Sequence, residues 1–192
     1  LNINPVIARD FSFMIQSIGM TAAAFTIIFM KLRLEWKSIL WSSVGGTFGL
    51  VFSLECIAPF LPPPYSKMYF VTIWAAFALS LYLLNKNRDR HVFEIIPEWN
   101  VSMLHFRCGI VNTKIIILLA TGFVGGILSA ISGSGIDICT FAVLTLLFRV
   151  SEKVATPTSV VIMAINTCVG FFWRGLIQNQ IEIESWRYFA VC

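Results

Sequence analysis

Two glycines interrupt an otherwise apolar stretch of the chain at Gly133-Ser134-Gly135. If this stretch lies at membrane depth, its irregular backbone is tolerated only where it is buried in protein or lines a wet cavity. The amide groups of such a turn lie at the positive end of the half-helix that follows, where an anion is stabilised. The turn therefore indicates an anion-binding site. The competing interpretation is a tight hairpin at the outer surface, where short connections need glycine.

Asp137 follows this turn and is the only acidic residue between Lys114 and Arg149. An ionisable group near or within a membrane segment is a functional candidate. Because a carboxylate repels an anion unless it is protonated, the functional interpretation of Asp137 is proton coupling. Two structural interpretations stay open, in which Asp137 caps the helix expected to start at Ile138 or lies among the outer lipid headgroups.

A further polar group opens the last long apolar run, in Thr156-Pro157-Thr158-Ser159. Proline suits the first turn of a helix and hydroxyl groups cap its amides, so the segment predicts a helix start. Thr158 and Ser159 are also suited to donate hydrogen bonds to a polyatomic oxyanion at this positive helix end. Asn166 lies two turns deeper, where it faces either a cavity or a neighbouring helix.

The residue types that usually build catalytic and metal sites form no such pattern here. His91 and His105 lie in one polar loop without a carboxylate or cysteine arrangement suited to catalysis. The five cysteines include no C-x-x-C pair and have no histidine at metal-ligand spacing, so we interpret them as packing thiols. We therefore expect no metal site.

The elements that must position these residues are those of a membrane protein. Of the 192 residues, 57% are apolar and 12% are charged, against about 45–50% and about 25% in soluble domains. The mean hydropathy is +0.80, and a soluble fold of this composition would expose apolar surface that it could not cover. The net charge of +4 includes no basic cluster interleaved with aromatic residues, so we expect a lipid bilayer and not a nucleic acid as partner.

Five uncharged runs are near the length of about 20 residues that a spanning helix needs. They are Phe11 to Met30, Ser38 to Leu54, Met68 to Leu84, Ile115 to Ile136 and Val154 to Trp173. A sixth run, Ile138 to Phe148, is too short to span alone and follows the glycine turn. We therefore predict an all-α polytopic transmembrane helix bundle with a broken or re-entrant helix pair around the turn. Small residues recur every three or four positions before the turn, which predicts close helix packing at Gly122, Gly126, Ser129 and Gly133.

Lys and Arg sort by loop, as they do in membrane proteins whose cytoplasmic loops carry the excess. The connections 31–37, 85–114 and 149–153 hold ten of the fourteen Lys and Arg residues. Six successive crossings place these connections on one side and leave the other side with Arg9, Lys67, Arg174 and Arg187. We therefore predict that the loop 85–113 is cytoplasmic. Asn100-Val101-Ser102 in this loop is a glycosylation sequon that would need the opposite side, but such sequons arise often by chance.

The chain also matches itself weakly at an offset of 147 residues, which pairs Ser12 with Ser159. The charge count makes the two segments opposite in orientation, because the run ending at Met30 ends inside and that ending at Trp173 ends outside. Inverted repeats are typical of transporters, whose sites lie near the midplane where broken helices of the two halves meet. We therefore predict part of a first repeat in 1–84, a connecting loop in 85–113 and part of a second repeat in 114–192. We expect the remaining parts of both repeats to lie outside this sequence, as in a fragment that lacks both ends.

The segment from Gly122 to Ser159 resembles the TauE/SafE family, the so-called sulfite exporters, which are polytopic membrane proteins built from two related halves. The likeness lies in the helix with spaced small residues, the glycine-rich turn, the apolar segment and the helix opening at Val154 to Ser159. Asp137 to Thr140 stand where the family has a proline. The first copy resembles the family more faintly, with Arg9 and Asp10 in place of a Thr-Pro pair. The resemblance implies export of a small, mostly sulfur-containing anion, with no prosthetic group.

Our leading hypothesis from the sequence is a secondary transporter, and specifically an exporter, of a small anion of the sulfur-containing class. Asp137 would couple protons, and the residues expected to bind the substrate are Ser12, Gln16, Gly133, Ser134, Gly135, Thr158, Ser159 and Asn166. One rival is a transporter of a cation or neutral solute coupled through Asp137. The other is a structural or receptor-like membrane protein whose polar groups join helices. An enzyme is the least supported class, because no nucleophile, base or metal set lies in the apolar runs, and the sequence sets no oligomeric state.

Overall fold

The computed structural model describes residues 5–57, 60, 63–86, 93, 96 and 113–178. In this part of the chain all regular structure is helical, apart from an isolated bridge between Phe93 and Val150. The helices are α1 (Pro5–Phe29), α2 (Trp36–Cys56), α3 (Pro63–Lys86), α4 (Thr113–Ser132), α5 (Ile136–Ala142) and α6 (Glu152–Phe172). Two π-helical turns extend α5 and α6, namely η2 (Val143–Leu147) and η3 (Trp173–Ile177). The predicted all-α class is confirmed.

Four segments of these helices are long and apolar enough to cross a membrane. They are Ile7–Phe29, Trp36–Cys56, Thr113–Ser132 and Glu152–Ile177. Large apolar residues on their outer faces are exposed, as at Phe25, Phe29 and Phe48, which are 69%, 88% and 69% exposed. An exposed apolar surface of this extent is expected where lipid tails are the solvent, so the chain is a multi-pass integral membrane protein.

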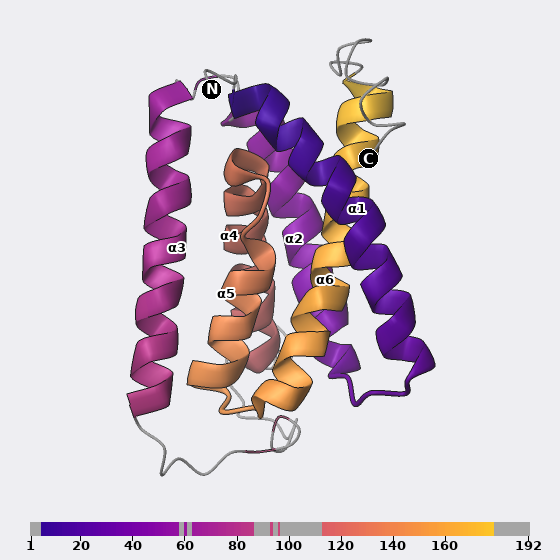
Figure 1. Cartoon of the computed structure of the whole chain (residues 1–192), viewed down its shortest axis with the longest axis vertical. Helices are drawn as coiled ribbons and strands as arrows, with labels where there is room; N and C mark the ends of the chain where they lie inside the picture. The colour runs from indigo at the N-terminus through magenta and orange to yellow at the C-terminus, as the bar shows by residue number, and fades with distance from the viewer. Residues whose placement is uncertain are drawn as a thin grey trace, which may run out of the picture.

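Successive helices alternate in direction through the bundle (Figure 1). α1, α3 and α5 run from the end that holds the start of α1 to the opposite end, and α2, α4 and α6 run back. The backbone of Phe93 exchanges hydrogen bonds with Arg149 and Ser151, at N–O distances of 2.9 and 2.8 Å. Part of the predicted 85–113 loop therefore lies at the same end as the α5–α6 connection. This is the end to which the charge count assigns the basic connections.

α4 and α5 form the broken pair that the sequence predicts. α4 has 20 residues, whereas α5 and η2 have seven and five, so the returning arm is only about 18 Å long at 1.5 Å per residue. This arm is too short for a hydrocarbon core of about 30 Å. It packs back along α4, because a Cβ atom on Gly125 would lie 2.9 Å from the Cα atom of Ile136.

Glycines bring α2 and α4 into backbone contact. A Cβ atom on Gly122 would collide with the carbonyl oxygen of Ser42, and one on Gly126 would collide with that of Gly46. The reverse contacts, of Gly45 with Leu119 and of Gly49 with Phe123, are equally tight. The predicted close packing at Gly122 and Gly126 is therefore confirmed, with α2 as the partner.

α1 and α6 pack in opposite directions along their lengths. Asp10 contacts Arg174 near the start of α1, and Thr21 Oγ1 lies 3.3 Å from Cys168 Sγ further along. Thr21 and Cys168 are themselves separated by 147 residues, the offset at which the chain matches itself. Antiparallel packing of α1 and α6 is the orientation that the charge count predicts for these two segments.

Candidate functional site

The turn between α4 and α5 is held by hydrogen bonds to α4. The amide of Gly133 donates to the carbonyl of Ser129 at 2.7 Å, and the amide of Ile136 donates to the Ser129 hydroxyl at 2.9 Å. Gly133 has φ = +82°, a conformation that glycine adopts readily and other residues rarely. The glycine at this position is therefore required by the backbone of the turn.

Two predicted binding residues of α1 lie against this turn. The Ser12 hydroxyl donates to the carbonyl oxygen of Gly133 at 3.3 Å, and Gln16 Nε2 donates to Ser12 Oγ at 2.8 Å. Gln16 Oε1 is buried and has no hydrogen-bond partner within the described part of the chain. α1 thus contributes polar groups directly to the glycine turn between α4 and α5.

Asn166 approaches the same region from α6. Its side chain is completely buried, and Nδ2 donates to the carbonyl of Ile162 at 2.9 Å. Oδ1 is without a partner among the described residues and faces Gly46, where a Cβ atom would lie 2.6 Å from it. Ile136, the first residue of α5, packs against the same glycine. Asn166 therefore lies beside the start of α5.

Asp137 lies in the first turn of α5, which begins two residues earlier than expected. Its Oδ1 atom is buried and has no hydrogen-bond partner in the described part of the chain. The N-cap residue of α5 is Gly135, so Asp137 lies inside the first turn and not at the cap position that the sequence suggested. A carboxylate in this turn is stabilised by the helix dipole.

Thr158 and Ser159 lie elsewhere along α6. The Thr158 hydroxyl accepts a hydrogen bond from the amide of Glu35 at 3.2 Å, and the Ser159 hydroxyl donates to the carbonyl of Thr156 at 2.9 Å. Thr158 is eight residues from Asn166, which is about 12 Å along a helix. Ser159 is the residue that the 147-residue offset pairs with Ser12. Because α1 and α6 are antiparallel, Ser12 contacts Gly133 and Ser159 does not. The predicted binding residues are thus divided into two groups. One pair, Thr158 and Ser159, lies near the start of α6. The others form what we call the turn group, which consists of Ser12, Gln16, Gly133, Ser134, Gly135 and Asn166.

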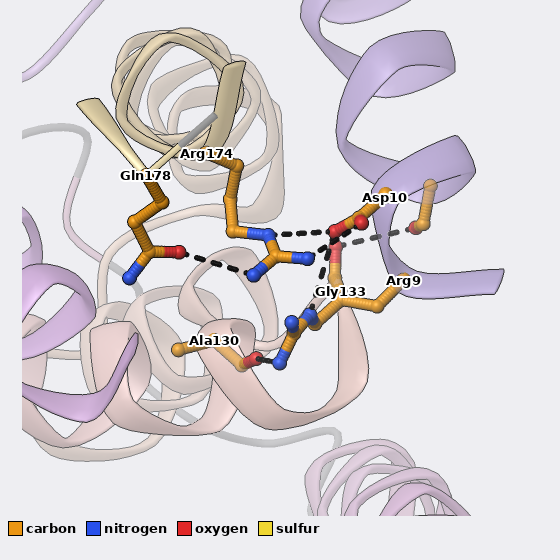
Figure 2. Close-up of polar contacts among 7 residues, drawn as sticks. Arg9, Asp10, Ala130, Gly133, Arg174 and Gln178 are labelled. Atoms are coloured by element: carbon orange, nitrogen blue, oxygen red, sulfur yellow. Dashed lines mark hydrogen bonds and ion pairs between the residues drawn. The ribbon is translucent and has the colours of Figure 1, made fainter. Parts of the chain in front are cut away.

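A buried charged cluster, which the sequence analysis did not assign to the site, lies next to the turn group (Figure 2). Arg174 donates from Nε to Asp10 Oδ1 at 2.9 Å and from Nη2 to Asp10 Oδ2 at 2.6 Å. Arg9 donates from Nη1 to the carbonyl of Ala130 at 3.2 Å. Arg9, Asp10 and Arg174 are 8%, 7% and 4% exposed. The sequence signal that could have indicated this contact is the opposite orientation predicted for the two segments, because antiparallel α1 and α6 bring the start of one helix against the end of the other.

Polar groups continue from this cluster towards the surface. Arg174 Nη1 donates to Gln178 Oε1 at 3.0 Å, and Gln178 Nε2 donates to Glu55 Oε1 at 2.9 Å. The indole of Trp173 donates to the same Glu55 oxygen at 2.8 Å. Since Glu55 is exposed at the end of α2, the cluster is connected to the outer rim of the bundle.

Metal-ligating residues do not gather anywhere in the described ranges. No group of three or more His, Cys, Asp or Glu that could hold a metal ion occurs there. Within the same ranges Cys56, Cys139 and Cys168 are free thiols. His91 and His105 lie outside the described residues. The polar groups at and beside the turn are hydroxyls, amides, guanidinium groups and the carboxylates of Asp10 and Asp137, of which the hydroxyl, amide N–H and guanidinium groups can donate hydrogen bonds to an anion.

Comparison with known proteins gives one finding. The model of the family described as "Sulfite exporter TauE/SafE" matches residues 4–191, nearly the whole chain. Searches of curated proteins and of solved structures give no match.

Proposed function

Because the chain belongs to the sulfite exporter TauE/SafE family, we propose that it exports a small sulfur-containing anion, such as sulfite or a sulfonate, through a site at the α4–α5 turn. The observation that carries this proposal is the hydrogen-bonded series from Gln16 to Ser12 and from Ser12 to the Gly133 carbonyl, within an irregular turn between apolar helices. Irregular backbone at such a depth is expected where a membrane protein binds its substrate.

The turn group has the chemistry for an oxyanion. Hydroxyl and amide donors on Ser12, Gln16, Ser134 and Asn166 surround the start of α5, where the helix dipole is positive. The carboxylate of Asp137 lies in the first turn of α5. We propose that an oxyanion takes this place when Asp137 is protonated or turns away, since two anions would otherwise repel each other. Export would then be coupled to a proton.

Alternating access follows from the inverted arrangement of α1 and α6. Ser12 and Gln16 belong to the first repeat and the turn belongs to the second, so relative movement of the two repeats would open the site to one side and then to the other. Thr158 and Ser159, near the start of α6, are proposed as a second group of hydroxyls that the anion contacts during transport. The end that holds 31–37 and 149–153 is proposed to face the cytoplasm, because the basic connections gather there.

A transporter of a cation or neutral solute is the second candidate, and one observation favours it. Gln16 Oε1, Asp137 Oδ1 and Asn166 Oδ1 are buried acceptor oxygens without hydrogen-bond partners in the described part of the chain. Acceptor oxygens suit a cation or a solute that donates hydrogen bonds. In this case Asp137 would be required in its charged form.

One flux experiment separates the two candidates. Purified protein in liposomes is tested for sulfite and methanesulfonate flux, with Ser12→Ala, Asp137→Asn and the double variant Thr158→Ala with Ser159→Ala. An anion exporter is expected to lose about tenfold or more of its apparent affinity in Ser12→Ala, the cost of one charge-assisted hydrogen bond, and to keep anion binding in Asp137→Asn.

Retained anion affinity in Ser12→Ala would remove the turn from the binding site. Unaltered flux in the double variant would remove Thr158 and Ser159. Loss of all transport in Asp137→Asn, together with cation-dependent flux in the wild type, would favour the second candidate.

A further inference from the structure

Two side-chain amides near the start of α5 use their donors and leave their acceptors without partners. Asn166 Nδ2 donates to the carbonyl of Ile162 at 2.9 Å, and Gln16 Nε2 donates to Ser12 Oγ at 2.8 Å. These bonds fix the orientation of both amides, because a carbonyl oxygen can only accept and the Ser12 hydroxyl gives its own hydrogen to the Gly133 carbonyl. The oxygen of each amide is therefore the atom that has no partner among the described residues.

These acceptor oxygens come from elements that meet at the start of α5. A Cβ atom on Gly46 would lie 2.6 Å from Asn166 Oδ1, and Ile136, the first residue of α5, packs against the same glycine. Gln16 reaches the turn before α5 through its bond within α1. Asp137 Oδ1, in the first turn of α5, is a further buried oxygen without a partner in the described ranges. Acceptors on α1, α5 and α6 therefore border one region.

Hydroxyl groups border the same region. Thr140 lies one turn after Ile136 on α5 and is completely buried, and Ser43 lies about one turn before Gly46 on α2 and is 8% exposed. Because α5 and α2 run in opposite directions (Figure 1), both steps lead the same way from the contact of Ile136 with Gly46. Both hydroxyl oxygens are buried and without a partner within the part of the chain that is described. Since a hydroxyl can donate as well as accept, the region offers both kinds of group.

Buried polar atoms without partners are uncommon in native proteins and costly, so several of them around one region indicate a ligand. The amide oxygens require a ligand that carries a hydrogen, whereas the hydroxyls can donate to the oxygens of an oxyanion. The carboxylate of Asp137 repels a doubly charged anion more than a singly charged one. A singly charged oxyanion that carries a hydrogen of its own meets all of these requirements.

We propose that the site selects oxyanions that carry a hydrogen-bond donor, so that sulfite is bound as hydrogensulfite. Its O–H group donates to Asn166 Oδ1, and its other oxygens accept from the hydroxyls of Thr140 and Ser43. This inference rests on the proposed anion transport and defines the protonation state of the substrate. Because sulfite takes up one proton near neutral pH, the exported anion carries a proton with it.

The test uses two anions of equal charge and similar shape. Sulfamate has an amino group, which donates hydrogen bonds, where methanesulfonate has a methyl group. Both stay singly charged near neutral pH, so the comparison is made at one pH and one protonation state of Asp137. Their sodium salts are titrated against thermal unfolding of the purified protein at constant sodium concentration. The wild type is expected to bind sulfamate about tenfold or more tightly than methanesulfonate, because the methyl group leaves buried acceptors unpaired.

Asn166→Leu removes the acceptor with little change in side-chain shape and is expected to abolish most of this preference. The matched control is Thr167→Val on the next residue of α6. Thr167 is 1% exposed, and its hydroxyl is bonded within the helix to the carbonyls of Met163 and Ala164. This control is expected to keep the preference of the wild type. Asn166→Ala, which cannot overpack the contact with Gly46, replaces Asn166→Leu if that variant does not fold.

The outcomes separate this inference from the proposed function. If sulfite, sulfamate and methanesulfonate neither stabilise the wild type nor cross the membrane of liposomes that contain it, the proposed function fails and this inference fails with it. If the wild type transports sulfite but binds sulfamate no more tightly than methanesulfonate, only this inference is overturned. A full preference for sulfamate in Asn166→Leu or Asn166→Ala would also overturn it. So would stabilisation that disappears when choline replaces sodium, because the acceptor oxygens would then hold a cation.

Discussion

At the residue scale, the turn depends on Gly133. With φ = +82° its backbone lies in the left-handed region, and a Cβ atom would lie 2.8 Å from Ser12 Oγ. Because glycine has no Cβ atom, the Ser12 hydroxyl can approach closely enough to donate to the Gly133 carbonyl at 3.3 Å. Absence of a side chain therefore serves both the backbone conformation and the approach of α1.

Gly133→Ala is expected to lower the free energy of unfolding by about 1–3 kcal/mol, the cost of a non-glycine residue in a strained backbone region. The measurement is thermal unfolding of the purified protein, with anion flux as a second readout. Gly19→Ala is the matched control, because a Cβ atom there would meet nothing within 4 Å. Equal losses of stability in the two variants would contradict the assignment of the constraint to the turn.

At the element scale, α2 and α4 form a rigid pair through their glycine contacts. α6 packs on this pair in parallel with α2, with Thr158 bound to the amide of Glu35 near one end and Gly170 near Leu50 at the other. α1 packs antiparallel to α6 and reaches the turn. The broken pair is thus held on one side by glycine packing against α2 and on the other by polar contacts with α1.

Gly126→Ala is expected to separate α2 from α4 and to lower the free energy of unfolding by about 1–3 kcal/mol or more, as overpacking does. The reason is that the new Cβ atom meets the backbone of Gly46, which has no flexible side chain to move away. Ala120→Val adds a larger group on an exposed face of α4 and is expected to change stability by less than about 0.5 kcal/mol. Thermal unfolding of both variants checks the comparison, and a tolerated Gly126→Ala would show that the helices are not in backbone contact.

At the scale of the whole molecule, the two ends of the bundle differ in charge and in connections. The connections 31–37 and 149–153 lie together at the end where α1 meets α2 and α5 meets α6, whereas Arg9 and Asp10 belong to the first turns of α1, which begins at the other end. In the proposed orientation, with the basic connections in the cytoplasm, an exported anion would leave at the end where α1 begins.

Single-cysteine labelling tests this polarity in intact cells that express the protein. Cys56 is an exposed thiol at the end of α2, and Lys153 is exposed at the start of α6, at the opposite end of the bundle. With the other cysteines changed to serine, Cys56 is expected to react with a membrane-impermeant maleimide from outside. A variant with Lys153→Cys as its sole cysteine is expected to react only after permeabilisation, and the reverse pattern would invert the proposed orientation.

Four of the five predicted spans and the broken pair could be predicted from the sequence, whereas the run Met68 to Leu84 lies in α3 without being among the candidate spans of the described residues. The position of the connections 31–37 and 149–153 at one end of the bundle could be predicted as well. Each depends on hydropathy, glycine content or charge within a short window, and the bilayer imposes the same requirement on every such window. The spacing of Gly122 and Gly126 predicted that this face of α4 packs closely against another helix. It did not predict that the partner helix is α2, because small-residue spacing does not identify a partner.

The composition of the candidate site was decided by the tertiary structure. Ser12 and Ser159 match at the 147-residue offset, yet only the position of α1 relative to the turn brings Ser12 to Gly133 and leaves Ser159 bonded within its own helix. Asp10 and Arg174 are 164 residues apart, and their pairing depends on the rotation and crossing of two helices. Such contacts depend on side-chain direction in three dimensions, which hydropathy and charge along the chain do not specify.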